Sequence, residues 1–190
     1  MSRVFWVRHG PTHARSMVGW SDIPADLSDA ARIARLSAHL PDDALVISSD
    51  LVRATATADA IAGTRTRLPH DSDLREIHFG AWELQAFDAI PDQDHLRAFW
   101  DQPGDIRPPG GESWNEITAR VNRAITRLLD AHPGRDIIAV AHFGAILTQV
   151  QQALGVTPFE AFAHKIDNLS VTELHRIDAR WQAERINHLP

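Results

Sequence analysis

The chain has 190 residues, no cysteine and a formal net charge of -6. The length suits one domain with a sizeable core, and the missing cysteines exclude disulfides, thiolate metal sites and thiol catalysis. An acidic chain without a basic tract or a long apolar stretch argues against nucleic acid and membranes as partners, so we expect a cytoplasmic protein. The sequence leaves the oligomeric state open, a homodimer included.

The first apolar run, residues 3–7, predicts a short buried strand close to the N-terminus. Its carboxyl end carries Arg8, His9 and Gly10 in direct succession. Ligands of open α/β sheets bind outside the carboxyl ends of strands. A guanidinium can hold two phosphate oxygens, and an imidazole can attack as a nucleophile at neutral pH. The tripeptide therefore marks a candidate anion site.

After a loop, Ser28 is predicted to begin a helix. One face of this helix carries apolar side chains, namely Ala30, Ile33, Leu36 and Leu40. Residues 44–47 predict a second strand, followed by a helix with Ser49 or Asp50 as N-cap and Gly63 after its last residue. This helix would carry Arg53 in its first turn.

The segment from about 71 to 111 breaks the alternation of strands and helices. It is rich in Asp, Pro, His and Trp. We expect a cap-like insertion of short helices and loops over the carboxyl edge of the sheet, within a single domain spanning residues 1–190. Its aromatic residues, Trp82, Phe87, Phe99 and Trp100, are expected to pack in the core or the cap. Arg97 and Arg107 are expected to be solvated.

Regular structure resumes at Ser113, which forms a capping-box pattern with Glu116. The long helix that follows has an inward face made of Trp114, Ile117, Val121, Ile125 and Leu128. Residues 136–141 predict a third buried strand, and a helix follows from about Gly144 to Leu154. Residues 169–175 and 181–186 predict a hairpin or an added edge strand. The alternation indicates an α/β fold with a mostly parallel sheet covered on both faces.

These elements bring reactive side chains from distant segments to one rim. His9 and His142 each follow a strand, Arg8 lies beside His9, and Arg53 begins a helix. Two guanidiniums and a helix N-terminus suit a phosphoryl dianion. Glu76 is the best candidate for the general acid, because a carboxyl group facing a phosphate has a raised pKa. Glu83 and Glu112 are the competing candidates.

Five motifs in this order resemble the histidine phosphatase superfamily, also called phosphoglycerate mutase-like. They are Arg8-His9-Gly10-Pro11-Thr12, Ser49-Asp50-Leu51-x-Arg53-Ala54-x-x-Thr57-Ala58, Leu74-x-Glu76-x-x-Phe79-Gly80-x-Trp82-Glu83, Gly110-Gly111-Glu112-Ser113 and Ala141-His142. The resemblance covers nearly the whole chain. It implies a three-layer α/β/α sandwich.

The resemblance also implies roles for these residues. His9 would become a phosphohistidine, with Arg8, Arg53 and His142 holding the phosphoryl oxygens. Glu76 would protonate the leaving group and then assist water, without metal or cofactor. The phosphatase branch, which includes alpha-ribazole phosphatase and broad-specificity phosphatases, is the nearest match.

Three positions depart from the family pattern. Arg15 stands where the family often has Asn, Phe143 where many members have Gly, and Leu84 where Gly is common. None of them removes a proposed catalytic group. Arg15 could bind a second anionic group and Phe143 could narrow the site, so we count both, with Thr12, among the substrate-binding candidates.

We therefore expect a phosphomonoesterase that acts on a small phosphorylated metabolite. Two alternatives remain open: a phosphoglycerate-type mutase, and a pocket that binds a phosphorylated ligand without catalysis. A metal pair formed by His9 and His13 is disfavoured, because Gly10-Pro11 between them disrupts a helix.

Overall fold

A computed structural model describes residues 2–178 and 180–190 of the chain. Its sheet has five strands in the order β2-β3-β1-β4-β5. β1 (Ser2–Arg8) and β2 (Leu45–Ser48) both pair in parallel with β3 (Ile137–Ala141). β4 (Val171–Ile177) pairs antiparallel with β1 and with β5 (Arg180–His188). The C-terminal hairpin is thus confirmed, and β4 is the strand that opposes the common direction.

Alternating side chains of β1 serve two separate layers. Val4 and Trp6 join one hydrophobic cluster, and Phe5 and Val7 join the other. This is why the strand is a continuous apolar run: both of its faces are buried.

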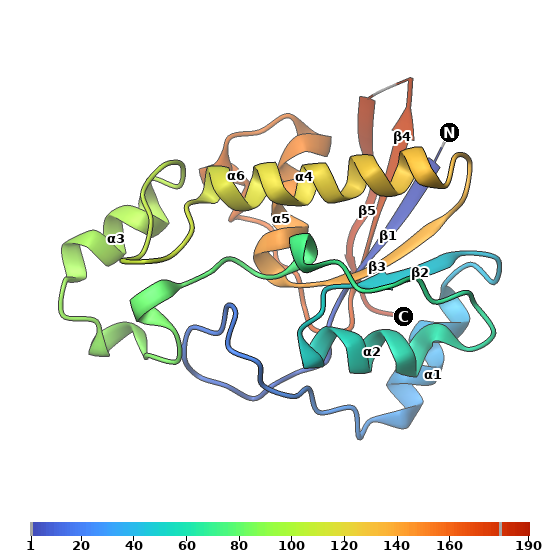
Figure 1. The fold of residues 1–190 in the computed structure, drawn as a ribbon, viewed down its shortest axis with the longest axis horizontal. Coiled ribbons are helices and arrows are strands. Elements are labelled where there is room, and N and C mark those ends of the chain that lie inside the picture. Colours follow the sequence, from blue (N-terminus) through green and yellow to red (C-terminus); the bar gives the residue numbers. More distant parts are fainter. Residues whose placement is uncertain (1, 179) are drawn as a thin grey trace.

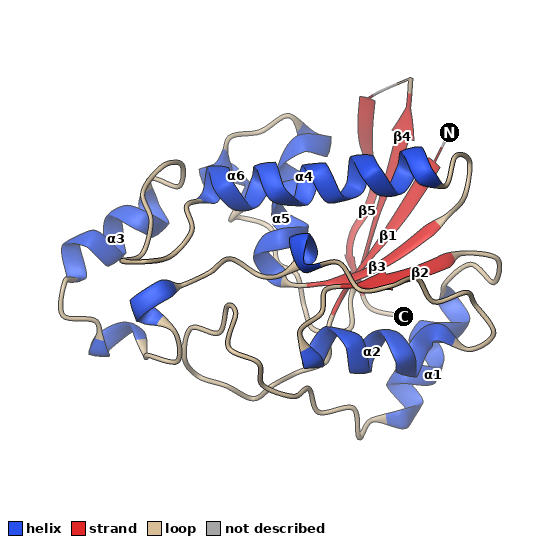
Figure 2. Cartoon of the chain, in the orientation of Figure 1, coloured by secondary structure: helices blue, strands red, loops and turns tan. Residues whose placement is uncertain are grey.

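The helices cover the two faces of the sheet in pairs (Figures 1 and 2). α1 (Ala30–His39) and α2 (Val52–Ala62) pack on the face that carries Phe5 and Val7. α4 (Trp114–Ala131) and α5 (Phe143–Leu154) pack on the opposite face. The expected three-layer arrangement is confirmed. It places the carboxyl ends of β1, β2 and β3 at one edge of the sheet.

Two helix starts differ from the sequence predictions. α1 begins after Asp29 instead of at Ser28, and Ala30 is exposed instead of facing the core. α2 has Leu51 as its N-cap, without a side-chain cap. The missing cap is supplied from another loop, because the Val52 N–H donates to Asp22 Oδ1 at 2.7 Å.

Ser49 and Asp50, the residues predicted to cap α2, have other partners. The Ser49 hydroxyl lies 2.6 Å from His142, and Asp50 forms an ion pair with Arg75. The N-cap prediction was therefore wrong. Both side chains instead tie neighbouring segments to the edge of the sheet where the strands end.

The other helix boundaries follow the sequence closely. The capping box of Ser113 and Glu116 is present at the start of α4. α5 begins at Phe143, one residue earlier than expected, with His142 as N-cap. It ends at Gly155, whose φ of 65° lies in the left-handed region that a glycine adopts without strain.

Between α2 and α4 the chain forms short helices and loops. These are η1 (Ser72–Leu74), η2 (Gly80–Trp82), η3 (Phe87–Ala89) and α3 (Gln93–Asp101). Figure 1 shows α3 projecting beyond the first turn of α4. Trp82 and Phe99 are buried, as expected, whereas Phe87 is exposed and Trp100 is half-buried. A further short helix, α6 (Pro158–Ala161), follows α5.

Among the described residues, every helix is too short or too polar to cross a bilayer.

Candidate active site

His9 directly follows β1 and has a fixed tautomer. Its Nδ1 lies 2.7 Å from the backbone oxygen of Gly10. A carbonyl oxygen only accepts, so Nδ1 carries the proton and Nε2 keeps its lone pair. Burial, together with the charge of Arg53, lowers the pKa of His9 to about 3. The ring is therefore neutral at physiological pH, and Nε2 is available as a nucleophile.

The backbone around His9 is held from two sides. The Gly10 N–H donates to Thr57 Oγ1 at 3.0 Å, and Asn168 Nδ2 donates to the carbonyl oxygen of His9 at 2.9 Å. Thr57 is fully buried in α2. The sequence motif contained Thr57 but gave it no task, and Asn168 was missed altogether.

His142, at the end of β3, lies against His9. The centroids of the two rings are 5.0 Å apart. His142 is fully buried, and burial followed by the nearby His9 and Arg53 holds its pKa well below the ordinary value. Its Nε2 lies 2.6 Å from Ser49 Oγ, while its Nδ1 is buried and has no partner among the described residues. When Ser49 donates to Nε2, Nδ1 carries a proton that can reach a ligand.

Arg53, in the first turn of α2, is 1% exposed. Its Nη2 donates to the oxygen of Gly19 at 2.6 Å and its Nη1 to the oxygen of Ser21 at 2.9 Å. Two carbonyl groups of one loop thus orient a buried guanidinium without neutralising it. The remaining positive charge is available to an anion in the cavity.

Glu83 holds this loop in place. Its carboxylate accepts from the N–H groups of Gly19 (3.1 Å) and Trp20 (2.7 Å) and from the Ser21 hydroxyl (2.7 Å). Burial alone would raise the pKa of Glu83, but these hydrogen bonds bring it below the ordinary value. Glu83 is therefore a structural acceptor, which weakens its candidacy as the acid.

Arg8 ends β1 beside His9. Its Nη1 donates to the oxygen of Ile166 at 2.6 Å, and its guanidinium carbon lies 5.5 Å from the centroid of the Phe143 ring. Its Nε is buried and has no partner among the described residues. Burial lowers the pKa of Arg8, an effect that the nearby Glu76 opposes. An arginine stays protonated despite such a shift.

Glu76 lies at the start of α5. Both of its carboxyl oxygens are 3.0 Å from the Gly144 N–H, and Oε1 also accepts from the Ile77 N–H at 2.9 Å. Burial raises the pKa of Glu76, against the opposing effect of these N–H groups and of the two arginines. A side chain at position 144 would not fit, because its Cβ would lie 2.5 Å from Oε1.

The backbone of Glu76 is fixed by Arg120 of α4. Arg120 Nη2 donates to the oxygen of Glu76 at 3.1 Å, and Trp20 Nε1 donates to the same oxygen at 2.8 Å. Glu112 forms a bidentate ion pair with Arg120 at 2.8 and 2.7 Å, so it too has a structural task. The sequence carried a signal for Arg120: it interrupts the apolar face of α4, three residues after Ile117.

Four of these side chains line one cavity of about 290 Å³: Arg8, His9, Arg53 and Glu76. Thr12 and Phe143, two of the substrate-binding candidates, also line it. His142 contacts His9 from a fully buried position. Arg15 is exposed and does not line the cavity, although its neighbours Ala14 and Ser16 do.

His13 does not join His9. Its Nε2 lies 2.8 Å from Asp26 Oδ2 at the surface. Throughout residues 2–178 and 180–190, His, Asp and Glu form no group of three that could hold a metal ion.

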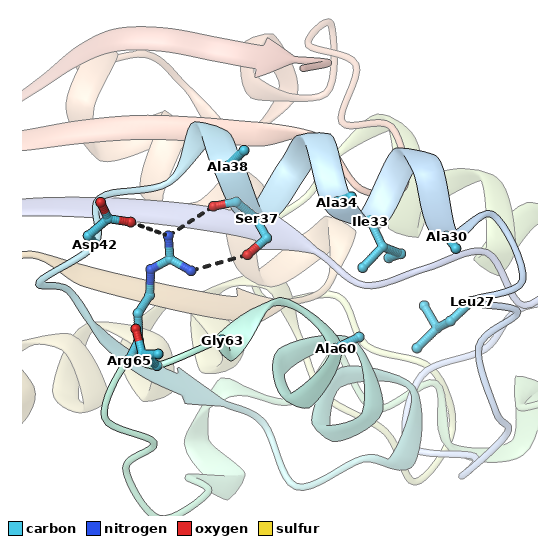
Figure 3. Close-up of a pocket in the computed structure, with 11 residues that line it drawn as sticks. Leu27, Ala30, Ile33, Ala34, Ser37, Ala38, Asp42, Ala60, Gly63 and Arg65 are labelled. Atoms are coloured by element: carbon cyan, nitrogen blue, oxygen red, sulfur yellow. Dashed lines mark hydrogen bonds and ion pairs between the residues drawn. The ribbon is translucent and has the colours of Figure 1, made fainter.

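A larger hollow of about 670 Å³ lies between α1 and α2 (Figure 3). Its lining is mostly alanine and aliphatic. Its one arginine, Arg65, already donates to the oxygens of Ser37, Leu40 and Pro41 and contacts Asp42. This hollow therefore offers no free cation and no nucleophile, and the smaller cavity at His9 is the candidate active site.

Comparison with known proteins agrees with this geometry. A sequence profile of the histidine phosphatase superfamily (branch 1) matches residues 4–189. The chain belongs to this superfamily. A probable phosphoglycerate mutase from Salmonella paratyphi C is 29% identical over 191 residues, which cover 96% of this chain and 89% of that protein.

Solved structures of the superfamily share the fold. YhfR from Bacillus stearothermophilus has a TM-score of 0.91 and 25% identity, covering 100% of this chain and 98% of that one. A mycobacterial glucosyl-3-phosphoglycerate phosphatase has a TM-score of 0.82 and 26% identity, covering 99% of each chain. The predicted family and fold are thereby confirmed, and the superfamily relatives include both phosphatases and a probable mutase.

Proposed function

We propose that the protein is a metal-independent phosphomonoesterase that hydrolyses a small phosphate ester through a phosphohistidine on His9. The observation that carries the proposal is the tautomer of His9. A neutral imidazole with its Nε2 lone pair free lines a cavity whose other ionisable groups are two arginines and a buried carboxyl.

In the first step, His9 Nε2 attacks phosphorus and the bond to the ester oxygen breaks. Arg8 and Arg53 bind the phosphoryl oxygens, and His142 Nδ1–H donates to one of them. The departing oxygen takes a proton from the Glu76 carboxyl group, so an alcohol leaves and a carboxylate remains. A buried carboxyl with a raised pKa, facing a phosphoryl group, is suited to hold that proton.

In the second step, the Glu76 carboxylate accepts a proton from water, and the resulting hydroxide attacks phosphorus. The bond from phosphorus to Nε2 breaks, so inorganic phosphate leaves and His9 regains its lone pair. Glu76 is protonated again, and the cycle is closed without metal or cofactor.

The competing function is a mutase, in which a hydroxyl group of the substrate takes the phosphoryl group in place of water. The 29% identity to a probable phosphoglycerate mutase supports it. The 26% identity to glucosyl-3-phosphoglycerate phosphatase, over 99% of both chains, supports hydrolysis. The two functions share the phosphohistidine and differ in the final acceptor.

One experiment separates them. A panel of phosphate esters is incubated with the protein in EDTA, and both free phosphate and positional isomers are measured. We expect free phosphate, and isomers without free phosphate would favour the mutase.

The same panel, carrying ³²P, tests the nucleophile. Labelling of the protein should be lost in His9→Ala and retained in His132→Ala, a histidine at the far end of α4. Labelling that survives in His9→Ala would refute the phosphohistidine on His9.

A further inference from the structure

Four aromatic rings line the same cavity as the reactive groups: Phe79, Phe87, Trp100 and Phe143, which we call the aromatic wall. We propose that this wall selects phosphate monoesters whose alcohol part ends in a flat apolar ring and carries no second charge. The inference rests on the proposed phosphatase function and adds the class of substrate.

The rings form one continuous surface. The centroid of Trp100 lies 6.1 Å from that of Phe79 and 5.9 Å from that of Phe87, within the range of favourable aromatic pairs. Phe87 leaves 51% of its surface exposed, and Trp100 is half-buried. A ligand ring placed against them would remove apolar area from water on both partners.

The volume of the cavity sets the size of the ring. A cavity of roughly 150 Å³ is enough for one benzene ring. The cavity at His9 measures about 290 Å³, which leaves room for the phosphoryl group beside a single ring or a small fused one. A second sugar or nucleotide unit would extend into solvent.

Charge sets the second restriction. Within residues 2–178 and 180–190, the arginines on the cavity lining are Arg8 and Arg53, and the phosphoryl group engages both. Arg15, the sequence candidate for a second anion, is exposed and lies off the lining. A carboxylate on the alcohol part would meet aromatic rings without a cation, which carries a desolvation cost.

Three esters of similar primary alcohols test the wall without changing the chemistry of the leaving oxygen. They are propyl phosphate, 3-phenylpropyl phosphate and 3-(phosphonooxy)propanoate. We expect kcat/KM for the phenyl ester to exceed that for propyl phosphate by about tenfold or more, and the carboxylate ester to be the poorest.

Variants locate the preference. Phe87→Ala should lower the ratio of phenyl to propyl ester by about threefold or more. Phe159→Ala, at a phenylalanine that is 60% exposed on α6 and off the cavity lining, should leave the ratio unchanged. Arg15→Ala should leave the rank of the carboxylate ester unchanged.

Two results would overturn the inference. One is equal kcat/KM for the phenyl and propyl esters in the wild-type protein. The other is a preference for the carboxylate ester that disappears in Arg15→Ala. Failure to hydrolyse any of the three would instead overturn the proposed phosphatase function.

Discussion

The cavity has two kinds of lining, and they are held in different ways. The reactive side chains are buried and fixed by backbone groups: His9 by the oxygen of Gly10, Arg53 by those of Gly19 and Ser21. The aromatic wall is held by ring packing, and Phe87 is half exposed. Hydrogen bonds fix an atom to a few tenths of an ångström, whereas apolar packing tolerates other shapes of similar volume.

This difference separates the two parts by the effect of substitution. Small displacements among the hydrogen-bonded groups should reduce turnover of every ester, because the reacting atoms must lie in line. Substitutions in the aromatic wall should change the ratio between esters. The three predictions below concern the hydrogen-bonded part and decrease in expected effect.

The largest effect is expected for Glu76→Gln, which keeps the shape of the side chain and removes its proton. Turnover of an alkyl phosphate should fall by about 10²–10⁴-fold. Turnover of 4-nitrophenyl phosphate should fall far less, because its leaving group departs without a proton. The comparison needs only kcat for both esters in each protein.

Glu184→Gln, on the exposed side of β5, is the matched control and should change neither rate. Equal losses for the alkyl and aryl esters in Glu76→Gln would remove Glu76 from the role of acid.

The second prediction concerns Gly144→Ala. The new Cβ would lie 2.5 Å from Glu76 Oε1 and push the carboxyl group aside, while alanine remains compatible with α5. We expect kcat to fall by about a hundredfold, the cost of a misplacement of about 1 Å. Gly104→Ala, where a Cβ has no neighbour closer than 3.9 Å, is the control.

A double variant shows whether Gly144 acts through Glu76. Gly144→Ala combined with Glu76→Gln should lose little more than Glu76→Gln alone, because both changes remove the same function. Losses that multiply would mean that position 144 matters for another reason.

Much of the site followed from strand ends in the sequence. Arg8, His9 and His142 are each placed by an apolar run that must be a buried strand, and parallel pairing of β1 with β3 brings them together. The layers followed equally well, since the period of apolar positions distinguishes strand from helix.

The supporting contacts did not follow, because they join segments that the sequence gives no reason to pair. Glu83 bonds to the loop around Trp20, more than sixty residues away, and Arg120 bonds to the carbonyl of Glu76. Ser49 looked like a helix cap because serine favours that position, but a buried imidazole took its hydroxyl instead. Tertiary partners outweighed local preference in each case.

The third prediction is a pH dependence of stability. His9 is buried in its neutral form with a pKa of about 3, whereas in the unfolded chain a histidine titrates near 6.5. Below pH 6.5 the unfolded state takes up a proton that the folded state refuses. The stability that neutral His9 contributes is therefore complete above pH 6.5 and is lost as pH falls toward 3.

Urea unfolding at pH 7 and pH 5 measures this effect. From pH 7 to pH 5 the wild-type protein should lose about 2 kcal/mol more unfolding free energy than His9→Gln, which has no proton to bind at that position. His132→Ala should lose as much as the wild type, because a half-exposed histidine titrates similarly in both states. An identical loss in wild type and His9→Gln would mean that His9 is hydrated and protonates normally. It would then be a cation at mildly acidic pH, and the neutral nucleophile would no longer be available there.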